Sequence, residues 1–67
     1  MPETTGVLIR KARQRKRMTQ ERLAEAVGVD RASVSAWERG VHYPQRYAGL
    51  IEELLDISLP EPEAAAS

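Results

Sequence analysis

The chain has 67 residues with ten basic and ten acidic residues, so its formal net charge is zero. It has no cysteine, which excludes disulfide bonds and cysteine-based metal sites. No run approaches the roughly 20 apolar residues of a membrane span, and the opening MPETTG lacks the basic start and apolar stretch of a signal peptide. We therefore expect one small cytoplasmic domain, for which a bundle of helices is the most economical fold.

The charges are distributed unevenly along the chain. Residues 1–49 hold all ten Lys and Arg and only five acids, whereas residues 50–67 hold five acids and no base. This asymmetry indicates a basic functional surface and an acidic end kept away from it. Seven of the cations lie between Arg10 and Arg22. Taken without the other motifs, this run of cations is explained equally well by a solvated helix face and by a binding surface.

The first predicted helix begins near Thr5, a common capping residue type, and runs to about Arg17. Ile9 and Ala12 are its clearest inward positions. The helix is expected to break at the segment MTQ, because a threonine there can accept hydrogen bonds from the free N–H groups of a following helix.

The second predicted helix spans about residues 20–27 and is capped by Thr19. Gly28 ends it, since glycine tolerates the left-handed conformation common just past a helix end. Two residues later, Asp30 is a good cap for a third helix, which runs from residue 31 to about 39 and ends at Gly40. Two short helices joined by a tight, glycine-containing turn are typical of a helix-turn-helix motif.

The fourth predicted helix runs from about Pro44 to Asp56, because proline disfavours helix at the residue before it and favours the first helical turn. Its predicted inner face comprises Tyr47, Leu50, Ile51, Leu54 and Leu55. The last residues carry two prolines, acids and small side chains, which predicts a frayed tail.

The segment MTQERLAEAVGVDRASVSAWERG resembles the Cro/C1-type (XRE-like) helix-turn-helix of bacterial and phage repressors. The matching elements agree in type, order and spacing, and they are Thr19-Gln20, Leu23-Ala24, Gly28-Val29, Val34 and Trp37-Glu38-Arg39-Gly40. The resemblance covers about residues 5–59. It implies an all-α, compact four- to five-helix bundle of the lambda repressor-like class, whose third helix enters the DNA major groove.

Two positions depart from the pattern of this family. Ala12 stands where the family usually has a larger aliphatic residue, so looser packing of the first helix is expected. Asp56 stands where glycine normally ends a helix. The expected organisation is a flexible N-terminus over residues 1–4, the DNA-binding domain over 5–59 and a disordered acidic tail over 60–67.

The third helix carries candidate base-reading residues on its outer face, where Ala32, Ser35 and Ala36 cluster, and on its flank, where Arg31 lies. Arg31 has the reach and the forked donors to bind guanine O6 and N7 together. The methyl groups of Ala32 and Ala36 can meet thymine methyl groups, and Ser35 can donate to or accept from either base type. Small side chains at these positions would let the helix lie deep in the groove.

Candidate phosphate contacts surround this helix. The resemblance places a phosphate-contacting glutamine at Gln20, where the helix N-terminus also offers free N–H groups to an anion. The other candidates are Ser33, Arg39, Arg10 and Arg46. The resemblance further suggests that Glu38 pairs with Arg13 as a structural salt bridge.

Other chemistry is not expected. Trp37 lies on the inner side of its helix with Val34, which favours packing over stacking on a base or ligand. His42 is the only histidine, and a metal site needs several converging ligands. A catalytic serine needs a positioned base and an oriented acid, so Ser33 and Ser35 are not read as nucleophiles. We expect no enzyme activity, no cofactor and no small-molecule ligand.

The sequence thus predicts a sequence-specific regulator that binds double-stranded DNA, most simply as a repressor. One such domain covers half a site, so a homodimer on a pseudo-palindromic operator is expected, formed in solution or only on DNA. Two alternatives stay open. One is an antitoxin-like or adaptor module whose main partner is a protein, and the other is a nucleoid-type binder with little sequence preference.

Overall fold

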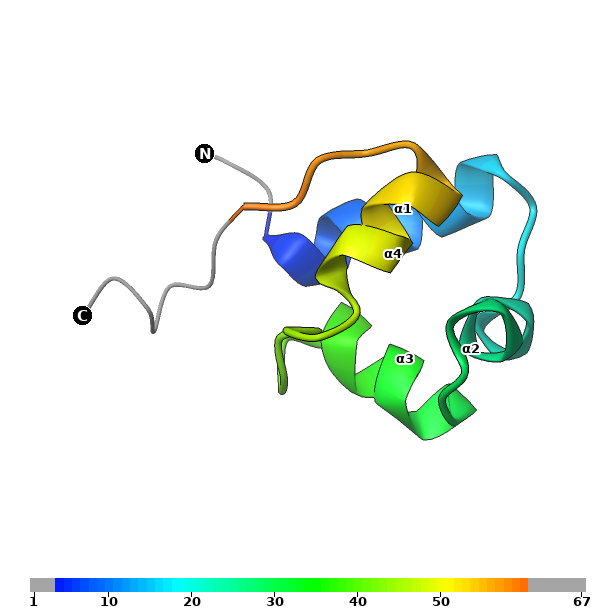
Figure 1. The fold of residues 1–67 in the computed structure, drawn as a ribbon, viewed down its shortest axis with the longest axis horizontal. Coiled ribbons are helices and arrows are strands. Elements are labelled where there is room, and N and C mark those ends of the chain that lie inside the picture. The colour runs from blue at the N-terminus through cyan, green and yellow to red at the C-terminus, as the bar shows by residue number, and fades with distance from the viewer. Residues whose placement is uncertain (1–3, 61–67) are drawn as a thin grey trace.

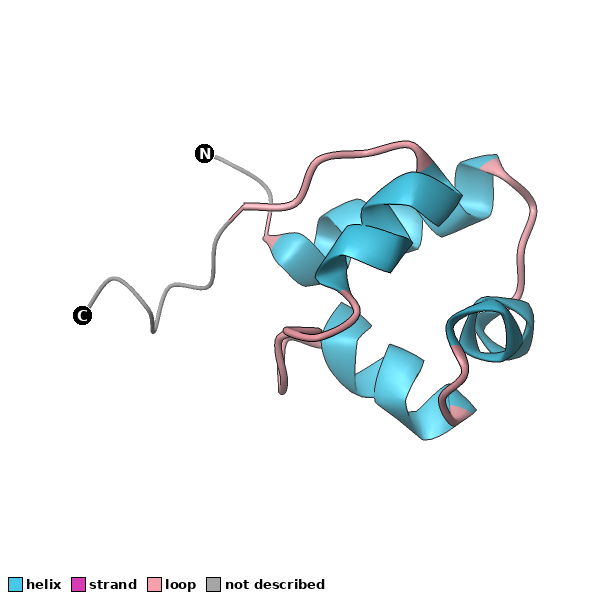
Figure 2. Cartoon of the chain, viewed as in Figure 1, coloured by secondary structure: helices cyan, strands magenta, loops and turns pink. Residues whose placement is uncertain are grey.

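The computed structural model describes residues 4–60, and within that range the chain forms four helices and no strand (Figure 2). The helices are α1 (Thr5–Arg15), α2 (Gln20–Val27), α3 (Arg31–Glu38) and α4 (Ala48–Leu55). This arrangement confirms the predicted all-α fold class. The predicted flexible start and acidic tail lie almost wholly outside the described residues. None of the described helices is long and apolar enough to cross a bilayer.

The helices pack so that α3 contacts both α1 and α2, while α4 lies along α1 (Figure 1). Each helix contributes side chains to one core. The buried apolar residues are Ile9, Ala12, Leu23, Ala24, Val27, Val34, Trp37, Ile51 and Leu55. Because α2 and α1 cover one side of α3, the opposite side of α3 is left on the surface of the bundle.

The ends of α1 differ from the prediction by one or two residues. The cap is Thr4 and not Thr5, because the Thr4 hydroxyl accepts from the Val7 N–H at 3.3 Å. The helix ends at Arg15 and not Arg17, since Arg17 has a left-handed backbone with φ of 57°. That left-handed residue turns the chain towards α2.

Helix α2 begins after Thr19 and ends at Gly28, as predicted. The Thr19 hydroxyl accepts from the Arg22 N–H at 3.0 Å, which satisfies one free donor of the first turn. Gly28 follows the helix with φ of 91°, a conformation that costs glycine little. Val29 is half-buried and packs against the core between α2 and α3.

Helix α4 begins four residues later than predicted. Pro44 is fully buried, and residues 45–47 form a turn in which the Pro44 carbonyl accepts from the Tyr47 N–H at 3.1 Å. The proline therefore anchors the loop in the core instead of opening the helix. Leu50, predicted on the inner face, is 42% exposed, whereas Ile51 and Leu55 are buried. The prediction for Leu50 is wrong because α1 covers only the side of α4 that carries these two residues.

No fifth helix follows α4 within the described residues. Asp56 ends α4 in a left-handed conformation with φ of 57°, so it takes the role that glycine has in the family pattern. The chain then runs back over the bundle, and Ile57 and Leu59 pack against the core. The Glu52 carboxylate accepts from the Leu59 N–H at 2.7 Å and holds this segment in place.

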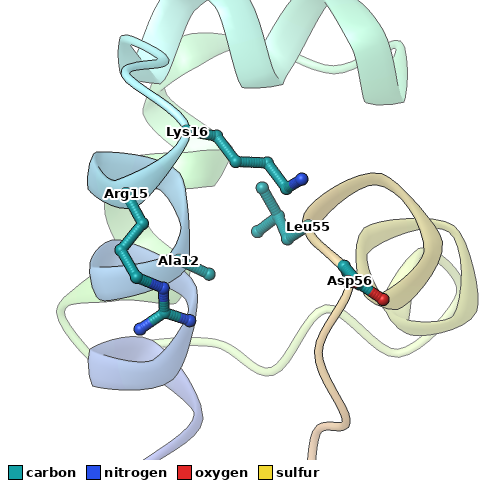
Figure 3. A pocket seen from close by; sticks show the side chains of 5 residues that line it. All are labelled: Ala12, Arg15, Lys16, Leu55 and Asp56. Atoms are coloured by element: carbon teal, nitrogen blue, oxygen red, sulfur yellow. The ribbon is translucent and has the colours of Figure 1, made fainter.

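The small side chain at Ala12 borders an open depression between α1 and the end of α4 (Figure 3). Ala12 is itself buried, with 1% exposure. The depression is also lined by Arg15, Lys16, Leu55 and Asp56. A larger aliphatic side chain at position 12 would extend towards this depression.

Candidate nucleic-acid interface

The outer face of α3 is the centre of the candidate site. Val34, Trp37 and Glu38 are buried against the bundle, so the helix has one side in the core and one side towards solvent. On the solvent side, Arg31 and Ala32 are exposed, and Ser35 and Ala36 are half-buried. Ala32, Ser35 and Ala36 thus lie on the side of α3 opposite the core, on a surface of short side chains, whereas Arg31 lies at the edge of that surface, on the flank next to buried Glu38.

Helix α3 starts at Arg31 with Asp30 as its cap residue, as predicted. Asp30 precedes the helix with an extended backbone, but its side chain makes no capping hydrogen bond. Its backbone carbonyl accepts from the N–H groups of Ser33 and Val34, at 3.0 and 3.4 Å. Asp30 is thus the N-cap residue of α3, as predicted, and it closes the first turn through its carbonyl without a side-chain hydrogen bond.

The Arg13 and Glu38 side chains form an ion pair that joins α1 to α3. Arg13 donates from Nε to Glu38 Oε2 at 2.6 Å and from Nη2 to Oε1 at 3.2 Å. It also donates from Nη1 to the carbonyl of Met18 at 2.7 Å. The side chains are only 12% and 4% exposed, so the pair belongs to the interior and not to a DNA contact surface.

Gln20 stands at the first position of α2, where the free N–H groups of the helix face solvent. Its side chain is half-buried and turned towards α3. The amide Nε2 donates to Glu38 Oε1 at 3.0 Å, and the amide oxygen accepts from Arg31 Nη1 at 3.5 Å, the long limit of a hydrogen bond. Sequence reasoning missed both contacts, because they join residues that are 18 and 11 positions apart.

The remaining candidate phosphate contacts come from separate parts of the chain. Arg10 lies on α1, Arg39 follows α3 directly, and Arg46 lies in the turn before α4; all three are exposed. Ser33 is half-buried in the first turn of α3. The fold therefore leaves the three arginines accessible to a ligand.

Trp37 lies in the core and His42 lies on the surface. Trp37 is 5% exposed, and its ring centroid lies 5.8 Å from that of Tyr47, so it is a core residue as predicted. His42 is exposed in the loop after α3. Within residues 4–60, no group of three or more His, Cys, Asp or Glu residues is arranged to hold a metal ion.

Gly6 is a structural residue that sequence reasoning missed. A Cβ at this position would lie 2.5 Å from the backbone oxygens of both Trp37 and Glu38. The first turn of α1 therefore packs directly against the end of α3, and this contact orients the candidate recognition helix. The available signal was a glycine inside a helical segment, which lowers helix propensity and often marks a close approach.

Two short helices, a tight turn and an exposed second helix define the class of this protein, a DNA-binding helix-turn-helix protein. A family model described as helix-turn-helix matches residues 9–61 of the chain. The chain therefore belongs to the helix-turn-helix family of Cro/C1 type. Searches of curated proteins and of solved structures returned no match.

Proposed function

We propose that the protein is a sequence-specific transcription regulator that inserts α3 into the major groove of double-stranded DNA. The observation that carries this proposal is the two-sided character of α3. Its inner side is buried, while its outer side presents small residues, with an exposed arginine at the edge, over a surface that a groove can cover.

Base reading is assigned to the outer face of α3 and to its flank at Arg31. Arg31 supplies a fork of donors for guanine, and this type of contact is the commonest specific one in the major groove. Ala32 and Ala36 offer methyl groups to thymine, and Ser35 adds a donor and an acceptor. Because these last three side chains are short, the backbone of α3 can approach the base edges closely.

Affinity is assigned to the phosphate contacts around this helix. Gln20 can donate from the start of α2, through its backbone N–H and through the amide hydrogen that does not face Glu38. Ser33 and Arg39 extend the contacts along α3, and Arg10 and Arg46 extend them to α1 and to the loop before α4. These contacts give orientation and salt-dependent affinity but no sequence preference of their own.

A homodimer on a pseudo-palindromic operator follows from the size of one domain, which covers half a site. Val7 and Leu8 of α1 are half-buried and Leu50 of α4 is 42% exposed, so we assign the contact between subunits to these apolar side chains. Repression requires only that a bound dimer occupies promoter DNA, and the cytoplasm of a bacterial cell is the proposed place of action.

The experiment that tests the proposal compares Arg31→Ala with Arg39→Ala. Binding is measured by gel shift on a preferred duplex, selected from a random library, and on its single-base variants. We expect Arg31→Ala to lose about 1–3 kcal/mol on the preferred site and to relax selectivity at one base position. Arg39→Ala is expected to weaken all duplexes about equally.

Two outcomes would redirect the assignment. If Arg31→Ala weakens every duplex uniformly, Arg31 contacts phosphate and another residue reads the bases. If random duplex competes as well as the selected site, the protein is a binder with little sequence preference. A pull-down with and without nuclease distinguishes DNA binding from an adaptor role, because a protein partner stays bound after the nucleic acid is digested.

A further inference from the structure

The chain after α4 is tied back to the loop that follows α3. Residues 57–60 run from the end of α4 back towards its start (Figure 1). The Glu52 carboxylate accepts from the Leu59 N–H at 2.7 Å, and the Tyr43 hydroxyl donates to the Pro60 carbonyl at 2.7 Å. Because Tyr43 belongs to the segment between α3 and α4, the second hydrogen bond holds Pro60 beside that segment.

Two exposed arginines flank Tyr43 in the same segment. Arg39 directly follows α3, four residues before Tyr43, and Arg46 lies three residues after it. The Val41 N–H donates to the Ala36 carbonyl at 2.9 Å, which keeps the start of the loop against the end of α3. Within residues 4–60, neither guanidinium forms a hydrogen bond or an ion pair with another residue. Both cations are therefore available to an anionic ligand.

The sequence beyond Pro60 is acidic. Glu61 follows directly, Glu63 comes two positions later, and residues 61–67 contain no base. At no more than about 3.6 Å per residue, Glu63 begins within roughly 11 Å of Pro60. The acidic end, predicted to be kept away from the basic surface, thus starts beside the loop that carries two of its arginines. A tether this short gives the carboxylates a local concentration on the order of millimolar at the loop.

We propose that the acidic segment of residues 61–63 is an intramolecular ligand of Arg39 and Arg46 and competes there with DNA phosphate. This inference rests on the proposed role of the two arginines as phosphate contacts. Exposed ion pairs are weak, so a duplex displaces the segment, but each displaced pair subtracts from the affinity. The loss is the same for every duplex, because phosphate contacts carry no sequence information. It is also largest at low salt, where exposed charges are screened least.

The test removes the two charges with Glu61→Gln and Glu63→Gln in one chain, which preserves the size of both side chains. The matched control combines Glu53→Gln and Asp56→Asn, which changes the net charge equally at two exposed positions near the end of α4. Affinity for a random duplex is measured by gel shift at low and moderate salt. We expect the first variant to bind about threefold to tenfold more tightly than the wild type at low salt, as the loss of two weak exposed pairs implies. The control should change the affinity by less than about twofold, and the gain should shrink as salt rises.

A second background distinguishes contact with the arginines from simple repulsion between the segment and DNA. In a chain that carries Arg39→Ala and Arg46→Ala, the segment has lost its proposed partners but would still repel phosphate. Neutralising Glu61 and Glu63 should therefore bring no gain in this background, because the two pairs of substitutions act on the same contacts.

The direct arm of the test uses the free protein and needs no DNA. The Nε–H signals of the arginines are recorded by NMR, with Arg10 and Arg22 as references. Neutralising the segment should shift the signals of Arg39 and Arg46 and leave the references in place. Tyr43→Phe, which removes only the hydroxyl that holds Pro60, should shift the same two signals in the same direction and by less.

The proposal is overturned if the signals of Arg39 and Arg46 stay unchanged when the segment is neutralised, or if the gain in affinity persists without the two arginines. The failure of the proposed function has a different signature. In that case the wild type and every variant leave the duplex unbound, and the NMR signals of the free protein still decide whether the segment contacts the loop. Thermal unfolding of each variant verifies that the fold is retained.

Discussion

Gly6 and Gly49 both lie in the first turn of a helix, yet their surroundings differ. A Cβ at Gly6 would lie 2.5 Å from two backbone oxygens at the end of α3, which cannot move aside as a flexible side chain can. A Cβ at Gly49 would have no neighbour within 4 Å, and this glycine is exposed. The first residue is required by packing, whereas the second only weakens the helix.

The two alanine variants are therefore expected to change stability in opposite directions. Gly6→Ala should lower the free energy of unfolding by about 2–3 kcal/mol, since α1 must move away from α3 to relieve the overlap. Gly49→Ala should raise it by about 0.5–1 kcal/mol through helix propensity and a less flexible unfolded chain. Urea unfolding followed by circular dichroism measures both, and equal effects of the two would contradict the close approach at Gly6.

Asp56 has a left-handed backbone conformation, which is unfavourable for a residue other than glycine. It is one of two non-glycine residues with positive φ among the described ones, the other being Arg17. Asp56→Gly should raise the free energy of unfolding by about 0.5–1 kcal/mol, because release from a left-handed backbone outweighs the added freedom of the unfolded chain. Asp56→Ala is the control, since it keeps a Cβ and should bring no gain. A less stable Asp56→Gly variant would mean that the aspartate side chain contributes more than its backbone conformation costs.

At the scale of elements, the Arg13–Glu38 pair connects three parts of the chain. It joins α1 to α3, and its Nη1 contact with the Met18 carbonyl adds the segment before α2. Exposed ion pairs contribute roughly 0–1 kcal/mol, whereas breaking a buried one can cost about 3–5 kcal/mol. With side-chain exposures of 12% and 4%, this pair belongs with the buried class.

Glu38→Ala is accordingly expected to lower the free energy of unfolding by about 3 kcal/mol, because Arg13 is left without its counter-charge in a mostly buried place. In a domain of this size the melting temperature should fall by roughly 10–20 °C. Glu25→Ala, at an exposed position of α2, is the control and should stay within about 0.5 kcal/mol of the wild type. A melting temperature for Glu38→Ala equal to that of the control would indicate that the ion pair is solvated and contributes little to the free energy of unfolding.

At the scale of the whole molecule, the fold exposes cations on the surface although the net charge of the chain is zero. The net charge of the chain is zero, but its cations all precede residue 50. The exposed cations named as phosphate contacts come from α1, from the end of α3 and from the loop before α4. Zero net charge therefore does not prevent binding to DNA, because association responds to the local field at the docking face.

The expected whole-molecule signature is a steep salt dependence of DNA affinity. Three to five phosphate contacts per subunit, at a slope of about −0.9 each, should give a slope of roughly −2.7 to −4.5 per subunit in a plot of log affinity against log salt concentration. Arg39→Ala should make this slope shallower by about one contact, which serves as the internal control. A flat response between low and moderate salt would exclude this docking mode.

The local features of this protein were determined by its sequence alone. Thr19 caps α2 and Gly28 ends it as their chemistry predicts, because capping and a left-handed turn depend only on residues a few positions apart. The spacing of apolar residues likewise predicted the buried face of α3, including Trp37 and Val34. Short-range rules apply here without knowledge of the rest of the fold.

Only the tertiary structure decided how these elements meet. It determined that Gly6 lies against the end of α3, that Pro44 fills the core instead of starting α4, and that the Gln20 amide joins Glu38 to Arg31. Each of these contacts joins residues distant in sequence or depends on which side of a helix a neighbour covers. Helical periodicity identifies an apolar face but not the partner that covers it, and so it placed Leu50 inside when α1 leaves it exposed.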